Sequence, residues 1–185
     1  MDAVIAYVRS IPPVKKKMPP IELPAEVRTA VEGMKHVIPP APPVDASEPI
    51  RRGAYLVTVS GCSFCHTTFH PATAYNPQMV VGGGTPMHGP WGKVASANIT
   101  PDASGISYYD EAMFLRAIRE GAVEGVRPLN HIMPWKRFRE MKDEDLKAIF
   151  AYLRTLPPVS HRVDNTEPPA PCKLCNNTHG FGDKN

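Results

Sequence analysis

The hydrophobic positions at the N-terminal end of the chain predict two short helices separated by proline-rich connectors. Apolar residues recur at helical spacing over residues 2–13, where a pair of prolines ends the pattern. A second helical pattern covers residues 25–36, and Pro24 suits its first turn, where the backbone N–H has no helical partner. Residues 14–24 and 38–46 are rich in proline and predict extended connectors.

A denser segment, residues 47–160, has the hydrophobic pattern of a folded domain. Helical spacing is found over residues 48–60, 111–120 and 143–156. The stretch 69–105 is rich in Gly, Pro, Asn and Thr and predicts ordered loop around a ligand. The expected caps are the N-cap residues Ser47 and Asp110 and the C-terminal Gly121. The overall expectation is an all-α fold with proline-rich extended segments at both ends.

The first helix repeats the last one. Residues 2–14 and 147–159 align without gaps, and seven of the thirteen positions are identical. The shared pattern is Ala-x-x-Ala-Tyr-x-Arg followed by Pro-Pro-Val. Chance similarity of two amphipathic helices is a poor explanation for so specific a match, and the offset is that of one domain with its connector.

Composition and charge remove several classes of function. The 185 residues are 42% hydrophobic and 21% charged, as in globular proteins, and the net charge is +3. The basic run at residues 15–17 lies among prolines and predicts a solvated linker, so we expect no nucleic-acid partner. No apolar stretch approaches the ~20 residues that a membrane-spanning helix needs. The first residues also lack the basic start and cleavage site of a signal peptide.

The most specific motif is Cys62-Ser-Phe-Cys65-His66, which has the C-x-x-C-H pattern of covalent c-type haem attachment. Two thiols one helical turn apart can reach the two vinyl groups on one edge of the porphyrin, and the adjacent histidine can then lie under the iron. A disulfide, a zinc half-site and a thioredoxin-like redox pair are the alternatives. Zinc would require two further ligands at suitable spacing, and the redox pair would require a βαβ setting. The sequence offers neither near the motif, which favours one covalent haem c.

A second axial ligand is expected if the haem transfers electrons. Met133 is the preferred residue, because it lies in Met133-Pro134-Trp135 between two predicted helices, where a stiff loop can cross the far haem face. A lone methionine is more often core filler, so rivals stay open, with His131 the main one. The other rivals are Met79, Met87, His88 and Met141.

From Arg52 to Val159 the chain resembles class I cytochrome c domains, in particular those in the multi-haem cytochrome c subunits of bacterial membrane-bound dehydrogenases for alcohols, aldehydes, gluconate or nicotinate. The matching segments occur in the family's order. They are Arg52-Gly-Ala-Tyr-Leu56, Gly61-Cys-Ser-Phe-Cys-His-Thr67, Asn98-Ile-Thr-Pro-Asp102, Phe114-Leu-Arg-Ala-Ile-Arg-Glu-Gly121, Met133-Pro-Trp135 and Asp143-Glu-Asp-Leu146.

The resemblance implies roles for several of these residues. His66 and Met133 are expected to be the axial pair. Gly53 and Tyr55 are expected where the first helix of the domain crosses Tyr152 on the last, and the segment starting at Asn98 is expected beside the haem edge.

The resemblance also implies a domain arrangement. Residues 1–46 resemble the final helix of a preceding, missing cytochrome domain followed by a connector with a short helix. Residues 47–160 are the cytochrome c domain, and residues 161–185 form an extended tail. Because such subunits carry several haem domains and mature outside the cytoplasm, we expect this chain to be the C-terminal part of a longer cytochrome.

The expected function is single-electron transfer through a His/Met-ligated haem, as a non-enzymatic module of a respiratory or dehydrogenase-linked chain. Its partners would be a dehydrogenase subunit, other cytochromes or a terminal oxidase, in the periplasm or on the outer face of the cytoplasmic membrane of a bacterium. The main alternative is a haem enzyme of peroxidase or thiosulfate-oxidising type, which requires an open or exchangeable iron position. A haem-based gas sensor would require a signalling domain, which the sequence does not show.

The tail carries a second cysteine pair, Cys172 and Cys175, which Asn176 rather than histidine follows. Three interpretations compete. A local disulfide or a disulfide-like redox pair is favoured in an oxidising compartment. A metal site would add His179 and a fourth ligand such as His161. A second, degenerate haem site is the third, although His179 is misplaced to lie under an iron.

Overall fold

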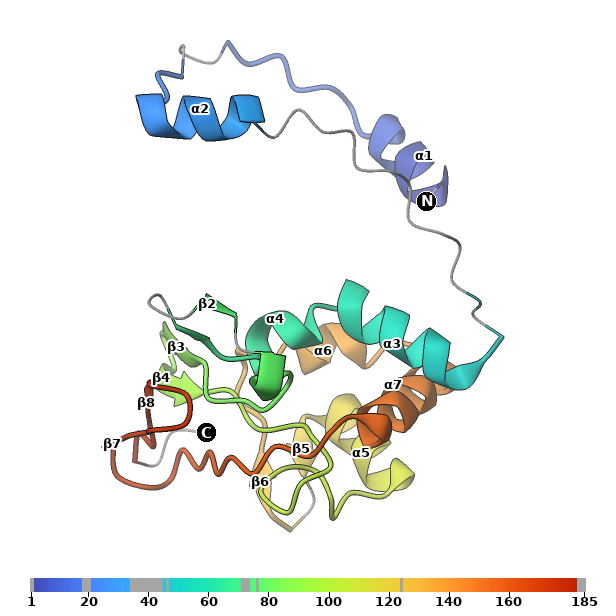
Figure 1. The fold of residues 1–185 in the computed structure, drawn as a ribbon. Helices are drawn as coiled ribbons and strands as arrows, with labels where there is room; N and C mark the ends of the chain where they lie inside the picture. Colours follow the sequence, from blue (N-terminus) through green and yellow to red (C-terminus); the bar gives the residue numbers. More distant parts are fainter. Residues whose placement is uncertain are drawn as a thin grey trace. The chain divides into compact units, whose positions relative to one another are not determined.

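The computed structural model describes residues 2–17, 21–33, 45, 47–70, 74–75, 77–123 and 125–182. The chain divides into two compact units, Met1–Pro42 and Pro43–Asn185. Figure 1 shows the helices and strands of both units in sequence colours. None of the described helices is both long and apolar enough to cross a bilayer.

The part of the first unit that the structure describes contains two helices, as the hydrophobic pattern predicted. Helix α1 spans Asp2–Ser10 and ends before the proline pair, and helix α2 spans Ala25–Gly33. The Pro24 carbonyl accepts the first hydrogen bond of α2, so this proline lies just before the helix rather than inside it. Residues 34–36 of the predicted second helix, and 38–44 and 46 of the second connector, lie outside the described residues.

The second unit has a helical core, which is built from the three long helices that the sequence predicted. Helix α3 spans Pro49–Val59, α5 spans Glu111–Glu120 and α7 spans Asp143–Thr155. Two short helices, α4 (Cys62–His66) and α6 (Trp135–Phe138), complete the set. The buried cluster at their junction comprises Val57, Val81, Ile106, Phe114, Ile118, Leu146, Ile149, Phe150 and Leu153.

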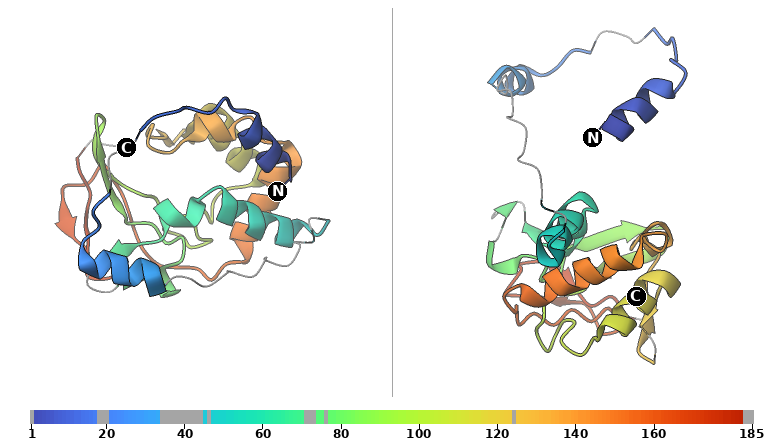
Figure 2. Two further views of the ribbon diagram at one scale, coloured as in Figure 1. Left: turned by 90° about the horizontal axis from the view of Figure 1, so that it is seen from above. Right: turned by 90° about the vertical axis from the view of Figure 1, so that its right-hand side faces the viewer.

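Helices α3 and α7 cross in close contact, as the two views in Figure 2 show. Gly53 permits the approach, because a Cβ at this position would lie 2.0 Å from the backbone oxygen of Ala148 and 2.7 Å from Cβ of Tyr152. An ion pair between Arg52 and Asp145, at 2.6 Å, joins the same two helices. The expectation that Gly53 meets the last helix is confirmed. Tyr55 is 47% exposed.

The helix caps agree with the sequence at one helix and differ at another. The Asp110 side chain accepts a hydrogen bond from the backbone N–H of Met113, and Gly121 ends α5 in the left-handed conformation with φ 72°, as predicted. The prediction of Ser47 as the N-cap of α3 is wrong. Glu48 caps this helix by accepting from the N–H groups of Ile50 and Arg51, while the Ser47 hydroxyl donates to Asp45.

The all-α expectation needs correction, because the described residues of the second unit also form four short antiparallel hairpins. The strand pairs are β1 (Phe69–His70) with β2 (Ala74–Tyr75), β3 (Pro86–Gly89) with β4 (Gly92–Ala95), β5 (Ala122–Val123) with β6 (Arg127–Pro128), and β7 (Ala170–Pro171) with β8 (Thr178–His179). A 3₁₀ turn, η1, spans Pro77–Met79. Much of the stretch expected to be loop is therefore hairpin, with Gly92 (φ 93°) supplying the left-handed residue of the β3–β4 turn.

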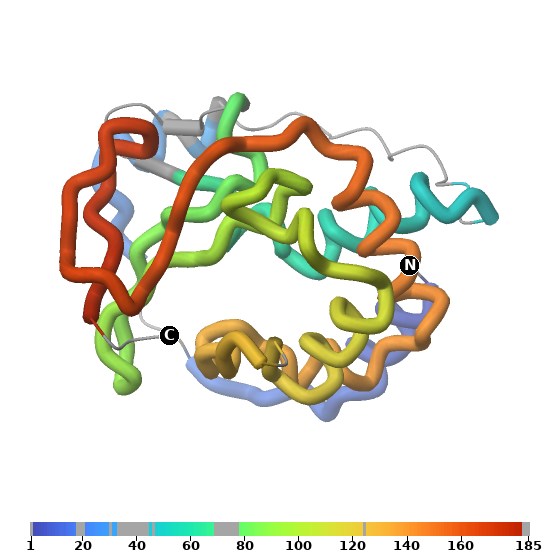
Figure 3. Tube along the Cα trace, turned by 90° about the horizontal axis from the view of Figure 1, so that it is seen from below, coloured from blue at the N-terminus to red at the C-terminus, as the bar shows by residue number. Residues whose placement is uncertain are grey.

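The segment after α7 packs against the same unit. His161 is buried, and its ring Nδ1 lies 2.8 Å from the backbone oxygen of Gly82. The Asn165 side chain bonds both the N–H and the C=O of Ala95 on β4, at 2.8 and 2.9 Å. Figure 3 shows the orange to red trace of this segment running beside the green trace of the part of the chain that it contacts.

Candidate functional site

The second unit encloses a cavity of about 400 Å³, a size typical of cofactor and ligand sites. Its wall combines α4, α5 and α7 with the segment from β4 to Ile99, the loop that precedes α6, and part of the tail. Most of the wall is apolar, with Val94, Ile118, Leu146 and Leu153 among its buried members.

Helix α4 presents the three residues of the C-x-x-C-H motif to this cavity. Cys62, Cys65 and His66 all lie on its wall, whereas Phe64 between them is 87% exposed. A single five-residue helix therefore carries both thiols on one face, since positions three apart lie on the same side of a helix. Gly61 begins the turn with φ 73°, a conformation that glycine adopts without strain.

The imidazole of His66 has a fixed orientation. Its Nδ1 lies 2.7 Å from the backbone oxygen of Ala97, to which it donates as the neutral ring, and Nε2 is left with its lone pair available to a metal. Burial lowers the pKa of His66, which favours this neutral form. The backbone is held as well, because the N–H of Gly83 donates to the His66 oxygen at 2.6 Å.

The two thiols of the motif lack the properties of a redox-active pair. Burial raises the pKa of Cys62 to about 11 and also raises the pKa of Cys65. Reactive cysteines have lowered pKa values, since the thiolate is the nucleophile. A zinc site is also disfavoured, because no cluster of three or more metal-ligating side chains includes these cysteines within the part of the chain that the structure describes.

The candidates for the second axial ligand fall into two groups, those on the cavity wall and those away from it. Met133, Met87 and Met141 lie on the cavity wall. The remaining three do not contribute to the wall. Met79 is buried in the core, and His88 and His131 are exposed. The two histidine rivals are therefore disfavoured, and Met133 stays a prediction among three methionines.

The backbone around Met133 is well restrained for a residue in a loop. Its N–H donates to the Asn130 oxygen at 3.0 Å, and its own oxygen accepts from the Trp135 N–H at 2.8 Å. The Asn130 side chain further accepts from the N–H of Ile132 at 3.0 Å. These bonds hold a compact turn directly before α6, with Met133 and Pro134 both on the cavity wall.

The segment at Asn98 lies on the wall, as expected from the resemblance. Asn98 is buried, and its amide oxygen accepts from the N–H and hydroxyl of Thr100 at 2.9 and 2.8 Å. Its amide nitrogen donates to the Val159 oxygen at 2.7 Å. Asn98 thus joins the cavity wall to the chain that leaves α7.

The sequence did not indicate that the tail would contribute to this cavity. Residues 162–165 lie on the wall, and Asn165 is anchored to β4. A polar segment without helical or alternating periodicity gives no signal for such a contact, which depends on one amide side chain pairing with one backbone position.

The donor set and the wall define the class of site. Two thiols, a neutral imidazole with an available Nε2 and a mainly apolar cavity match the requirements of covalently attached haem. No family model matches the chain.

Comparison with curated proteins gives a more particular resemblance, to cytochrome c subunits of dehydrogenases. The chain is 32% identical over 127 residues to the gluconate 2-dehydrogenase cytochrome c subunit of Pantoea cypripedii, a match that covers 68% of this chain and 27% of the relative. It is 33% identical over 135 residues to the fructose dehydrogenase cytochrome subunit of Gluconobacter japonicus, covering 71% and 26%. It is 35% identical over 104 residues to the cytochrome c subunit of the quinone-type alcohol dehydrogenase of Gluconacetobacter polyoxogenes, covering 56% and 21%. The resemblance stated from the motifs is confirmed, and the chain spans about a quarter of the length of these relatives.

Proposed function

We propose that the second unit is a c-type cytochrome domain that carries one haem and transfers single electrons. The observation that carries the proposal is the placement of Cys62, Cys65 and His66 on one face of α4, at the wall of one mainly apolar cavity. The similarity to dehydrogenase cytochrome subunits supports it independently.

The residues would hold the cofactor in distinct ways. The thiols of Cys62 and Cys65 would hold the haem as thioethers, each formed by addition of S–H across one vinyl group, which consumes no redox equivalents. His66 would be the axial ligand through Nε2, because Nδ1 is already bonded to the Ala97 oxygen. Met133 is proposed as the second axial ligand. When bound, the haem supplies a one-electron Fe(III)/Fe(II) couple.

The protein's own contribution would be to hold the ligands and exclude water. A mainly apolar wall favours the less charged, reduced state of the site, and thioether ligation raises the reduction potential relative to two histidines. With His66 and the proposed Met133 both bound, the iron would have no open position for peroxide or other substrates. We therefore infer an electron-transfer role rather than haem enzyme activity.

The relatives suggest the wider setting. Because the names of the similar proteins describe cytochrome subunits of dehydrogenases, we propose that a dehydrogenase subunit or another cytochrome supplies the electrons. We also propose a location in the periplasm or on the outer face of the cytoplasmic membrane, where c-type haem is attached. The repeat of α7 in α1 suggests that the native protein carries a further haem domain before this one.

Extraction with acidified acetone tests covalent attachment. We expect the haem to stay with the polypeptide and the pyridine haemochrome spectrum to give one haem per chain. A Cys62→Ser, Cys65→Ser double variant should lose its haem to the solvent layer. Recovery of the wild-type haem in the solvent would overturn the proposal.

Substitution of the wall methionines tests the axial ligand. Met133→Ala should abolish the weak far-red charge-transfer band of the oxidised protein and allow cyanide to bind, whereas Met87→Ala and Met141→Ala should preserve the band. Loss of the band in either of those two variants, with Met133→Ala unchanged, would reassign the ligand. Rapid binding of cyanide or peroxide by the wild type would instead favour a haem enzyme.

A further inference from the structure

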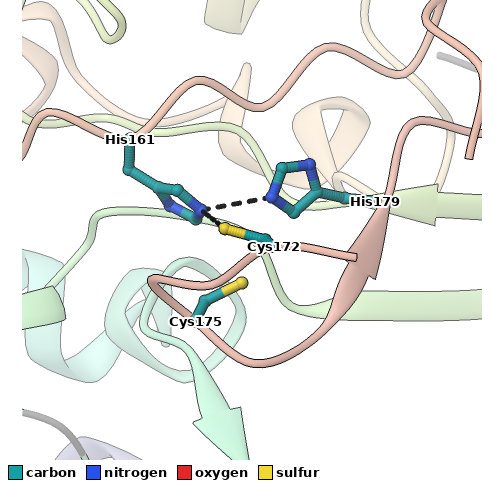
Figure 4. A group of neighbouring side chains, drawn as sticks. All are labelled: His161, Cys172, Cys175 and His179. Carbon is teal, nitrogen blue, oxygen red and sulfur yellow. Dashed lines mark hydrogen bonds between the residues drawn. The ribbon is translucent and has the colours of Figure 1, made fainter. Parts of the chain in front are cut away.

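A second group of metal-ligating side chains lies in the tail, apart from the residues of the haem motif. It consists of His161, Cys172, Cys175 and His179, here named the tail cluster. One ligand atom from each residue can be chosen so that all four lie within 4.8 Å of one another. Figure 4 shows the two imidazole rings and the two sulfur atoms converging on one point. Among the described residues this is the one such group.

The local sequence explains how three members of the tail cluster come together. A tight turn joins the two cysteines: the Asn176 N–H donates to the Cys172 oxygen at 2.9 Å, and the Cys172 N–H donates to the Asn177 oxygen at 2.8 Å. Asn176 has φ 58°, a left-handed conformation that asparagine tolerates better than most residues. The β7–β8 hairpin then places His179 opposite Ala170, beside the turn.

The fourth member, His161, lies at the start of the tail, outside the β7–β8 hairpin, and is held by its own contacts. Its backbone N–H donates to the hydroxyl of Ser104 at 2.9 Å, and its ring Nδ1 lies 2.8 Å from the Gly82 oxygen. Nδ1 must donate in that contact, since the carbonyl can only accept. In the neutral ring, Nε2 therefore carries a lone pair, and this atom faces the other members of the tail cluster. Metal-bound histidines commonly have the same arrangement, in which the other ring nitrogen donates to a backbone carbonyl.

Two of the six ligand–ligand distances are close to the edges of a tetrahedron around one ion. The two Nε2 atoms of His161 and His179 are 3.3 Å apart, and the Cys172 sulfur is 3.4 Å from Nε2 of His161. Zinc bonds of about 2.0–2.1 Å to nitrogen and about 2.3 Å to sulfur give tetrahedral edges of about 3.3 Å for N–N and about 3.6 Å for N–S. The remaining distances are within 4.8 Å, so shifts of about 1 Å or less would bring those pairs to such edges.

Other interpretations explain fewer of these contacts. A disulfide, which the cysteine pair alone favoured, would use two of the four side chains and leave the paired imidazoles without a role. The structure keeps both thiols free. A two-iron cluster would place the sulfur and nitrogen ligands on different irons, whereas here a sulfur and a nitrogen contact each other directly. Two thiolates and two imidazoles in a tetrahedron are the donor set typical of zinc.

We propose that the tail cluster is a structural zinc site. His161 and Cys175 are each only 3% exposed, and the four protein ligands complete the coordination without an open position. The site goes beyond the proposed electron-transfer function and does not depend on it.

The position of the site indicates what the ion would stabilise. Gly84 packs against it, since a Cβ there would lie 2.5 Å from the His161 ring and 3.3 Å from the Cys175 sulfur. The neighbouring Gly83 bonds the His66 backbone, and Asn165 in the same tail segment bonds β4 at the cavity wall. The ion would therefore hold the tail in place where its residues 162–165 form part of the wall of the proposed haem cavity.

Metal analysis of the purified full chain is the primary test. After dialysis against a weak chelator, elemental mass spectrometry should give about one zinc per chain, counted separately from the iron of any haem. Cys172→Ser and His179→Ala should each lower the zinc content by at least about tenfold. His88→Ala is the matched control, because it removes an exposed histidine from β3, and it should keep the zinc.

Two further measurements keep the test independent of variant folding. Cobalt(II) exchanged into the wild-type protein should show intense tetrahedral ligand-field bands with thiolate-to-cobalt charge transfer. Intact mass under denaturing conditions should show both cysteines reduced. A two-proton mass deficit, a metal-free protein with two titratable thiols, or iron in place of zinc at the tail cluster would each overturn the proposal.

Discussion

The crossing of α3 and α7 makes Gly53→Ala an informative perturbation. The new Cβ would lie 2.0 Å from the Ala148 oxygen, below the 3.0 Å that real contacts respect. The oxygen belongs to the α7 backbone, so no side-chain rotation relieves the overlap. The two helices must separate by about 1 Å, since interiors are packed too densely to absorb the carbon otherwise.

The expected cost follows from the contacts that this separation loosens. A gap of about 0.5–1 Å reduces the dispersion energy of each contact by roughly a quarter to a half. Overpacking typically lowers the free energy of unfolding by about 1–3 kcal/mol. Helix α7 also carries Leu146, Ile149 and Leu153, which are buried in the core and would shift with it, so we expect the upper end of that range. Alanine inside a helix stabilises the folded state by about 0.5–1 kcal/mol relative to glycine, which offsets part of this cost. The net loss of unfolding free energy is therefore about 2 kcal/mol.

Urea unfolding followed by far-UV circular dichroism measures this loss. Thr58→Ala is the matched control, because it introduces alanine at an exposed position on the same helix and should change the unfolding free energy by less than about 0.5 kcal/mol. If Gly53→Ala is neutral or stabilising, helix propensity dominates at this position. The close crossing would then be refuted as the reason for the glycine.

Three other substitutions test the caps and the buried polar contacts by the same urea assay. Gly121→Ala should cost about 2–4 kcal/mol, because φ is 72° and the Cβ would lie 2.1 Å from the Trp135 ring; a neutral result would contradict this packing. Asp110→Ala should cost about 1 kcal/mol through loss of the cap, and Asp110→Ser should recover most of it. Asn98→Ala should cost about 3 kcal/mol, since it leaves buried backbone groups unpaired. A loss below about 1 kcal/mol would show that water replaces the amide.

The sequence predicted the long helices because their signals are local and repeated. In α5 the Asp110 cap, the apolar period and Gly121 all agree, and the structure reproduces each of them. The N-cap of α3 was predicted wrongly because Ser47 and Glu48 are adjacent and either side chain could accept from the first N–H groups of the helix. Which of them does so depends on the conformation of the residues just before the helix. Ser47 is turned toward Asp45, which leaves Glu48 to cap.

The hairpins and the tail contacts could not be read from periodicity. Strands of two to four residues are too short to show alternation, so the stretch around β3 and β4 reads as glycine-rich loop. For the tail cluster, residue type alone indicated the metal option. The structure was needed to show that His161 and His179 both meet the two cysteines in space.

The glycine run at residues 82–84 illustrates how one short loop can serve both proposed metal sites. The Gly83 N–H donates to the backbone oxygen of His66. A Cβ on Gly83 would lie 2.5 Å from the backbone of Ala97, and the Ala97 carbonyl is the group that orients the His66 ring. Gly84 packs against His161, to whose ring the Gly82 carbonyl is bonded. A side chain at position 83 or 84 would force the proposed axial histidine or the tail cluster out of place. Glycine at positions 83 and 84 is therefore explained by the close approach of the Ala97 backbone and of the His161 ring, and the sequence pattern of the loop itself does not show this reason.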